Sequence, residues 1–225
     1  MKKISFFLFL ALLFSLAVTT YLWFFYPQKT VEKYQVELYD LDNVPVLKSK
    51  EFILDDLSLS ATAVYAIDLS SMTVLYEKDS QKVLYPASTS KMMTALVALD
   101  TYDLAENLVV AKEATVSGNK LAWQEGSSVT VQDLLAALLI FSANDSAYIL
   151  ANHDPQGADN FIYKMNQKAN LLGLTQTHFV NPAGLDDPGQ VSTARDLSII
   201  ARELLKHQQL KELVATKYKQ ISGQN

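Results

Sequence analysis

Tyr85-Pro86-Ala87-Ser88-Thr89-Ser90-Lys91-Met92-Met93-Thr94 is the segment of this chain that says most about its fold. Pro86 fixes the backbone near its start, because the proline ring restricts φ and removes an N–H donor. The residues from 92 to 99 are almost all apolar or Ala, so we expect a helix that protein surrounds on most sides. The stretch therefore predicts a turn that leads directly into a buried helix.

Two polar residues, Ser88 and Lys91, lie at the mouth of this helix. Because they are three residues apart, they share one helix face. A Lys in an apolar setting has a lowered pKa, and its neutral amine can accept the proton of a Ser hydroxyl. The pair is therefore a candidate nucleophile and general base in an S-x-x-K motif. The alternative is a helix-start Ser beside a surface Lys, and a second S-x-x-K, Ser117 to Lys120, is interpreted as a chance match.

The segment before the turn predicts a β-hairpin. Residues 61–68 and 73–77 are rich in strand-forming side chains, and 69–72 separates them without the Gly or Asn typical of tight turns. Two strands alone are marginally stable, so the hairpin needs further strands or a helical cover. We expect the helix that begins at Ser88 to supply that cover.

After the turn, the sequence predicts a series of helices. Thr130 with Asp133 and Thr193 with Asp196 are spaced as N-cap pairs. The expected helices, read from apolar periodicity, are 131–141, 146–151, 159–172, 193–207 and 210–215. Residues 177–186 are dense in turn formers and predict a long loop.

Polar residues interrupt two apolar helices at 142–145, which reads Ser-Ala-Asn-Asp. In the functional interpretation this segment presents Ser142 and Asn144 to a cleft. In the alternative it is a simple turn between helices, capped by Asn144 or Asp145. The sequence does not decide between the two.

Composition limits the function. The chain has 225 residues, a net charge of −5 and 49% hydrophobic residues, which fits one globular domain plus an apolar segment. There is no basic bias, so nucleic acid is not an expected partner. There is no Cys, which excludes disulfides, a Cys nucleophile and thiolate metal sites. The three His residues lack ligand spacing, so we expect neither a metal nor a cofactor.

The N-terminus predicts export. Lys2 and Lys3 precede an uncharged run, 4–26, that would extend about 34 Å as a helix, against about 30 Å for a hydrocarbon core. We favour an uncleaved signal-anchor over residues 1–26, with a cleaved signal peptide as the alternative. Residues 27–58 are interpreted as a stalk. In both cases the remainder, 59–225, is expected on the extracytoplasmic face of a bacterial membrane.

Four motifs occur together in one order. They are P-A-S-T-S-K-M-M-T-A-L at 86–96, S-A-N-D at 142–145, H-F-V-N-P-A-G-L-D-D-P-G at 178–189 and S-T-A-R-D-L at 192–197. This set resembles the serine-type D-alanyl-D-alanine carboxypeptidases, the low-molecular-mass penicillin-binding proteins. The resemblance implies an α/β (α+β) fold, in which a helical cluster packs on an antiparallel sheet as in the β-lactamase-like transpeptidases. It also implies peptidoglycan stem peptides ending in D-Ala-D-Ala as substrate and β-lactam antibiotics as ligands.

The resemblance also implies roles for individual residues. Ser88 resembles the nucleophile, and its backbone N–H resembles half of the oxyanion hole. Lys91 resembles the general base. Ser142 resembles the hydroxyl that relays a proton to the leaving amine, and Asn144 resembles the side chain that holds substrate and supports Lys91.

The family's third motif, Lys-Thr/Ser-Gly on a strand that lines the site, does not occur in these 225 residues. The resemblance therefore implies an incomplete sheet with unpaired edges, and a chain that is a fragment or a truncated product. The sequence leaves open whether such a chain is active. It also leaves two other functions open, a serine β-lactamase and a non-catalytic cell-wall-binding remnant.

Overall fold

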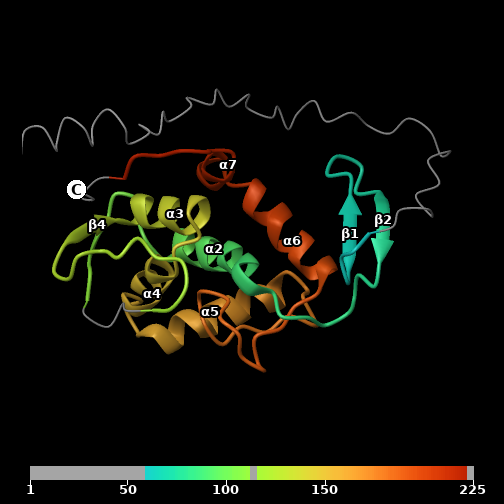
Figure 1. The fold of residues 1–225 in the computed structure, drawn as a ribbon, viewed down its shortest axis with the longest axis horizontal. Helices are drawn as coiled ribbons and strands as arrows, with labels where there is room; N and C mark the ends of the chain where they lie inside the picture. The colour runs from blue at the N-terminus through green and yellow to red at the C-terminus, as the bar shows by residue number, and fades with distance from the viewer. Residues whose placement is uncertain (1–58, 112–115, 222–225) are drawn as a thin grey trace, which may run out of the picture. The chain divides into compact units, whose positions relative to one another are not determined.

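The computed structural model describes residues 59–111 and 116–221, and the predicted membrane segment and stalk lie outside them. Figure 1 shows the order of the elements along the chain. The strands are β1 (Val64–Ile67), β2 (Val74–Lys78), β3 (Asn107–Val109) and β4 (Ser128–Thr130). The helices are the 3-10 helix η3 (Ala87–Ser90), α2 (Lys91–Thr101), α3 (Val131–Ile140), α4 (Asn144–Asn152), α5 (Ala158–Leu171), α6 (Ala194–Leu205) and α7 (Gln208–Val214).

Helix α2 is central to the helical cluster and packs against α3, α4, α5 and α6 (Figure 1). Its run from Met93 to Ala98 is buried, as its apolar sequence predicts. The largest side chains that the core encloses come from all of these helices, and they include Met93, Leu96, Leu134, Leu138, Leu150, Phe161 and Ile200. The prediction that this helix is buried and surrounded by protein on most sides is therefore confirmed.

The predicted N-caps are also confirmed. Thr130 Oγ1 accepts a hydrogen bond of 3.1 Å from the Asp133 N–H, and Thr193 Oγ1 accepts one of 3.0 Å from the Asp196 N–H. Each cap satisfies a backbone donor that has no partner within the helix. These caps set the starts of α3 and α6, and α3 leads directly to the Ser142–Asn144 segment.

Strands β1 and β2 form the predicted hairpin, antiparallel with a register shift between Ala66 and Ile67. The turn contains no Gly. It is stabilised by the Asp68 carboxylate, which accepts hydrogen bonds from both the N–H and the hydroxyl of Ser71. In the described part of the chain these strands pair only with each other, and neither contains a fully buried residue. In the described residues this sheet therefore has only two strands, which agrees with the incomplete sheet that the family resemblance implied.

Two features of the fold differ from the sequence prediction. The helix that packs on the hairpin is α6, not the helix that follows Ser88, because α2 is already enclosed by other helices (Figure 1). A second antiparallel pair, β3 with β4, was not predicted. Each of its strands has only three residues, too few for a period-2 pattern to emerge.

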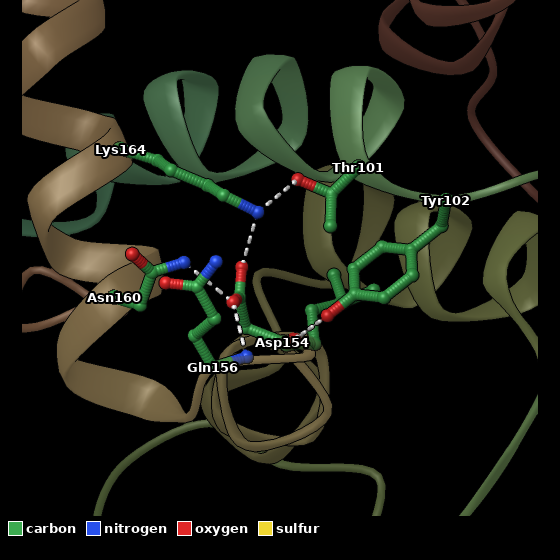
Figure 2. A network of polar contacts seen from close by, with 7 residues as sticks. Thr101, Tyr102, Asp154, Gln156, Asn160 and Lys164 are labelled. Carbon is green, nitrogen blue, oxygen red and sulfur yellow. Dashed lines mark hydrogen bonds and ion pairs between the residues drawn. The ribbon is translucent and has the colours of Figure 1, made fainter.

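An ion pair between a buried carboxylate and a half-buried Lys connects three helices beside this core. The Asp154 carboxylate, which is fully buried, accepts hydrogen bonds from Lys164 Nζ at 2.6 Å, Asn160 Nδ2 at 2.7 Å and the Gln156 N–H at 3.0 Å (Figure 2). Lys164 Nζ also donates to Thr101 Oγ1. Burial alone would raise the pKa of the Asp154 carboxyl, but these hydrogen bonds hold its pKa below the ordinary value. The network joins the ends of α2 and α4 to α5.

We expect Asp154→Asn to lower the free energy of unfolding by about 1.5–3 kcal/mol at neutral pH. The folded-state pKa of Asp154 lies below its unfolded value, so its contribution is complete above about pH 4 and is lost as the pH falls through the folded pKa. Urea unfolding of both chains at several pH values measures the difference. It should shrink below about pH 4, and a difference that is constant with pH would contradict this account.

Candidate active site

The predicted nucleophile lies on a strained, exposed turn. Ala87 has φ of 48°, in the left-handed region that a side chain disfavours, and it begins the short helix η3. Pro86 before it is buried, whereas Ser88 is exposed to solvent. Backbone strain of this kind is common at active sites, where the fold holds a reactive side chain in a fixed position. The hydroxyl of Ser88 therefore lies at the surface, immediately before a buried helix.

Lys91 is the first residue of α2 and is only 2% exposed. Its Nζ forms hydrogen bonds with Ser88 Oγ at 2.9 Å and with the Ala183 carbonyl oxygen at 2.8 Å. Burial lowers the pKa of the Lys91 ammonium from 10.5 to about 8. A substantial fraction of Lys91 is therefore neutral near pH 8, and the neutral amine can take the Ser88 proton while it still donates to Ala183.

The loop after α5 supplies that second acceptor. The Asn181 side-chain oxygen accepts hydrogen bonds from the N–H groups of Ala183, Gly184 and Leu185, at 3.2, 2.8 and 3.0 Å. Its amide nitrogen donates to the Leu185 carbonyl at 2.9 Å. Asn181 thus folds the loop around one side chain, which presents the Ala183 carbonyl to Lys91.

Further contacts fasten this loop to the nucleophile turn. Thr94 Oγ1 donates to the Pro182 carbonyl at 2.6 Å. Gln190 is buried and donates from Nε2 to Ser90 Oγ at 3.1 Å, while its Oε1 accepts from the Val180 N–H at 2.7 Å. The sequence predicted residues 177–186 as a loop but assigned no role to Asn181 or Gly184, and Gln190 lies outside that predicted range. A buried Gln between turn formers has no local signature, so only the long-range contact identifies it.

The other two predicted site residues lie at the junction of α3 and α4. Ser142 has φ of 61° and is half-buried, and in the described part of the chain its hydroxyl forms no hydrogen bond. Asn144 is the first residue of α4, not part of the preceding loop, and is 5% exposed. Its Nδ2 donates to the Ser117 carbonyl at 2.6 Å, and its N–H donates to the Asn119 carbonyl at 2.7 Å.

The structure therefore brings Ser88 and Lys91 into direct contact. Lys91 and Asn144 share no hydrogen bond in the described residues. Lys91 bonds to Ser88 and Ala183, whereas Asn144 bonds to the 117–119 backbone. Any support that Asn144 gives Lys91 is thus not a direct bond, and the roles of Ser142 and Asn144 stay predictions.

Comparison with known proteins gives the same family as the sequence resemblance. The family model described as D-alanyl-D-alanine carboxypeptidase matches residues 50–224. The chain is 33% identical over 167 residues to the D-alanyl-D-alanine carboxypeptidase DacF of Bacillus subtilis, an alignment that covers 72% of this chain and 43% of the relative. It is 40% identical over 151 residues to DacB2 of Mycobacterium tuberculosis, covering 66% of this chain and 52% of the relative.

Solved structures agree. A D-alanyl-D-alanine carboxypeptidase from Mycobacterium tuberculosis superposes with a TM-score of 0.65 at 39% identity, over 68% of this chain and 59% of that one. The carboxypeptidase DacD from Francisella tularensis superposes with a TM-score of 0.67 at 27% identity, over 74% of this chain and 44% of that one. The penicillin-binding type of fold is thereby confirmed. The chain spans about half the length of the relatives that it matches. By the family match and these likenesses, it belongs to the D-alanyl-D-alanine carboxypeptidase family.

Proposed function

We propose that this chain carries the nucleophile of a serine D-alanyl-D-alanine carboxypeptidase that trims peptidoglycan stem peptides. One observation carries the proposal: exposed Ser88 lies 2.9 Å from the amine of buried Lys91, whose pKa is lowered to about 8. A nucleophile beside an unprotonated base is what acyl transfer requires. Membership of the family supports the substrate class.

In the first step, Ser88 Oγ attacks the carbonyl carbon of the penultimate D-Ala and its proton passes to Lys91. The carbonyl oxygen becomes an oxyanion, and the backbone N–H of Ser88 donates a hydrogen bond to it. The hydrogen bond to Ala183 keeps the Lys91 amine directed at the turn while its charge changes.

In the second step, the peptide C–N bond breaks. The proton held by Lys91 passes through the hydroxyl of Ser142 to the amine of the terminal D-Ala, which leaves. Asn144 holds the stem peptide through a hydrogen bond to its backbone. Water then attacks the Ser88 ester, which releases the shortened peptide and restores the hydroxyl and the neutral amine.

A β-lactam antibiotic acylates the same serine. Opening of the lactam ring joins its carbonyl to Ser88 Oγ and gives the proton to the ring nitrogen, which stays tethered and blocks water. A lasting adduct is therefore the expected product, whereas a serine β-lactamase would release it rapidly. The family match favours the carboxypeptidase.

The site is proposed to act outside the cytoplasm. Residues 1–26 serve as a signal-anchor or signal peptide, 27–58 as a stalk and 59–225 as the catalytic domain. The uncharged run and the two lysines that precede it support this arrangement. Among the helices of the described residues, none is both long and apolar enough to cross a bilayer.

The test is the intact mass of the full 225-residue chain after incubation with benzylpenicillin. We expect one lasting adduct, and peptide mapping should assign it to Ser88 and not to Ser117 of the second S-x-x-K. Ser88→Ala should remove it. A folded chain that gains no mass, a variant that still does, or rapid turnover of penicillin would contradict the proposal.

A further inference from the structure

The segment 117–123, which leads into β4, lies along the first turn of α4. It contains Ser117-Gly118-Asn119, which repeats the Ser-x-Asn spacing of Ser142 and Asn144 and has no assigned function. The carbonyl oxygens of Ser117 and Asn119 accept the two hydrogen bonds that Asn144 donates. The segment therefore fixes both the backbone and the side-chain amide of a predicted substrate-binding residue.

Gly118 makes the contact close. A Cβ at this position would lie 2.7 Å from Asn144 Nδ2, nearer than side-chain atoms approach one another. The amide of Asn144 thus rests directly on the backbone of the segment. In the described residues its other end, Oδ1, accepts no hydrogen bond, which leaves that oxygen available to a substrate N–H.

One buried carboxylate holds the segment in place. Asp145, 2% exposed, accepts hydrogen bonds from the Ala122 N–H at 2.8 Å, the Leu121 N–H at 3.3 Å and the Ser146 N–H at 2.9 Å. Ala122 has φ of 56°, and two successive N–H groups converge on the one anion. Asp145 takes part in no ion pair within the described residues, so backbone donors stabilise its charge.

A neighbouring contact extends the same row. Trp123 Nε1 donates to Ser146 Oγ at 2.9 Å, and both side chains are buried. The segment is otherwise exposed from Ser117 to Lys120, so its own side chains give it little hold on the protein. Its placement over Asn144 depends on the bonds to Asp145 and Ser146.

We propose that Asp145 is a positioning residue: by binding the 121 and 122 N–H groups it holds the 117–123 segment on α4, and this segment orients the Asn144 amide for substrate. The proposal rests on the proposed function, since it concerns the same site. Without the carboxylate, the segment lifts, Ser117 no longer engages Nδ2, and the amide is free to rotate.

Asp145→Asn tests this in the full chain, because it keeps the size of the side chain but replaces an acceptor by an amide that opposes the N–H donors. We expect amide hydrogen exchange within 117–123 to accelerate, and the rate of acylation by benzylpenicillin to fall about tenfold or more. Unchanged exchange in this segment would overturn the proposal.

Two controls separate positioning from a loss of stability. Asp154→Asn removes a comparably buried carboxylate elsewhere on the protein and should leave the acylation rate of the folded chain unchanged. In the Asn144→Ala background, Asp145→Asn should cause no further loss of rate, because the residue that it positions is gone. Equal losses in both Asp variants, or additive effects with Asn144→Ala, would overturn the proposal.

The experiment also distinguishes this proposal from the proposed function. A wild-type chain that penicillin does not acylate contradicts the proposed function. The exchange measurement still decides the positioning of the segment in that case, since accelerated exchange in Asp145→Asn supports it and unchanged exchange refutes it.

Discussion

Replacing Lys91 with methionine is expected to slow acylation of Ser88 by about 10²–10⁴-fold, the usual contribution of a general base. Methionine matches the length of the Lys stem, with sulfur in place of Cδ, and lacks the amine, so Ser88 keeps its position on η3 but loses its proton acceptor. The measurement is the rate of covalent labelling by a fluorescent penicillin. Lys206→Met, at an exposed position on the protein surface, is the control and should leave the rate unchanged.

The same variant should fold at least as well as the wild type. Lys91 is buried without an acidic partner among its hydrogen bonds, and its lowered pKa shows that burial disfavours its charged form. An apolar side chain avoids that cost, while the two lost hydrogen bonds oppose the gain. Loss of the folded state in this variant would contradict the expected stability and assign Lys91 a structural role.

The pH dependence of the wild type follows from the pKa of Lys91. Only the neutral amine can accept the Ser88 proton, so the acylation rate should rise with pH and level off above about 8. Stability changes in the same direction: the folded-state pKa lies below the unfolded value of 10.5, so the unfolded chain binds more protons between these pH values and stability increases with pH. A rate that falls as the pH rises through 8 would exclude Lys91 as the base.

The parts of the fold that the sequence predicted are those fixed by local signals. The Thr130–Asp133 and Thr193–Asp196 caps act within one turn, and the apolar run after Lys91 reports its own burial. The pairing of β3 with β4 depends on backbone atoms about twenty residues apart, which leave no periodic trace in strands this short. The packing of α6 on the hairpin likewise depends on long-range contacts, because α2 is already enclosed by other helices.

The site divides in the same way. Ser88 and Lys91 were predicted because the helix itself brings residues three apart together. Lys91 bonds to the Ala183 carbonyl, and its neighbour Ser90 bonds to the Gln190 amide. Both partners are backbone or uncharged groups and come from about a hundred residues further along the chain. Asn144 was predicted, but the Ser117 carbonyl that holds it belongs to a segment interpreted as a chance match.

Gly184→Ala should disable the nucleophile by contact alone. Gly184 has φ of +79°, and a Cβ there would lie 1.8 Å from the Ala87 carbonyl oxygen and 3.1 Å from the Ser88 nitrogen. Backbone atoms cannot yield as a flexible side chain can, so the loop and the nucleophile turn must separate. Their separation withdraws the Ala183 carbonyl from Lys91 and shifts the Ser88 N–H, which we propose stabilises the oxyanion.

A displacement of about 1 Å at a reacting group costs about 10²-fold in rate, so we expect Gly184→Ala to lose at least that factor in penicillin labelling. Gly126→Ala is the matched control, because Gly126 has the same φ of +79° but nothing within 4 Å of the added Cβ. Both variants carry the cost of a left-handed Ala, about 1–2 kcal/mol. Labelling rates and urea unfolding of the two variants isolate the contact from that shared strain. Equal rates in both would mean that the loop does not hold the nucleophile turn, and that Lys91 keeps its orientation without the Ala183 carbonyl.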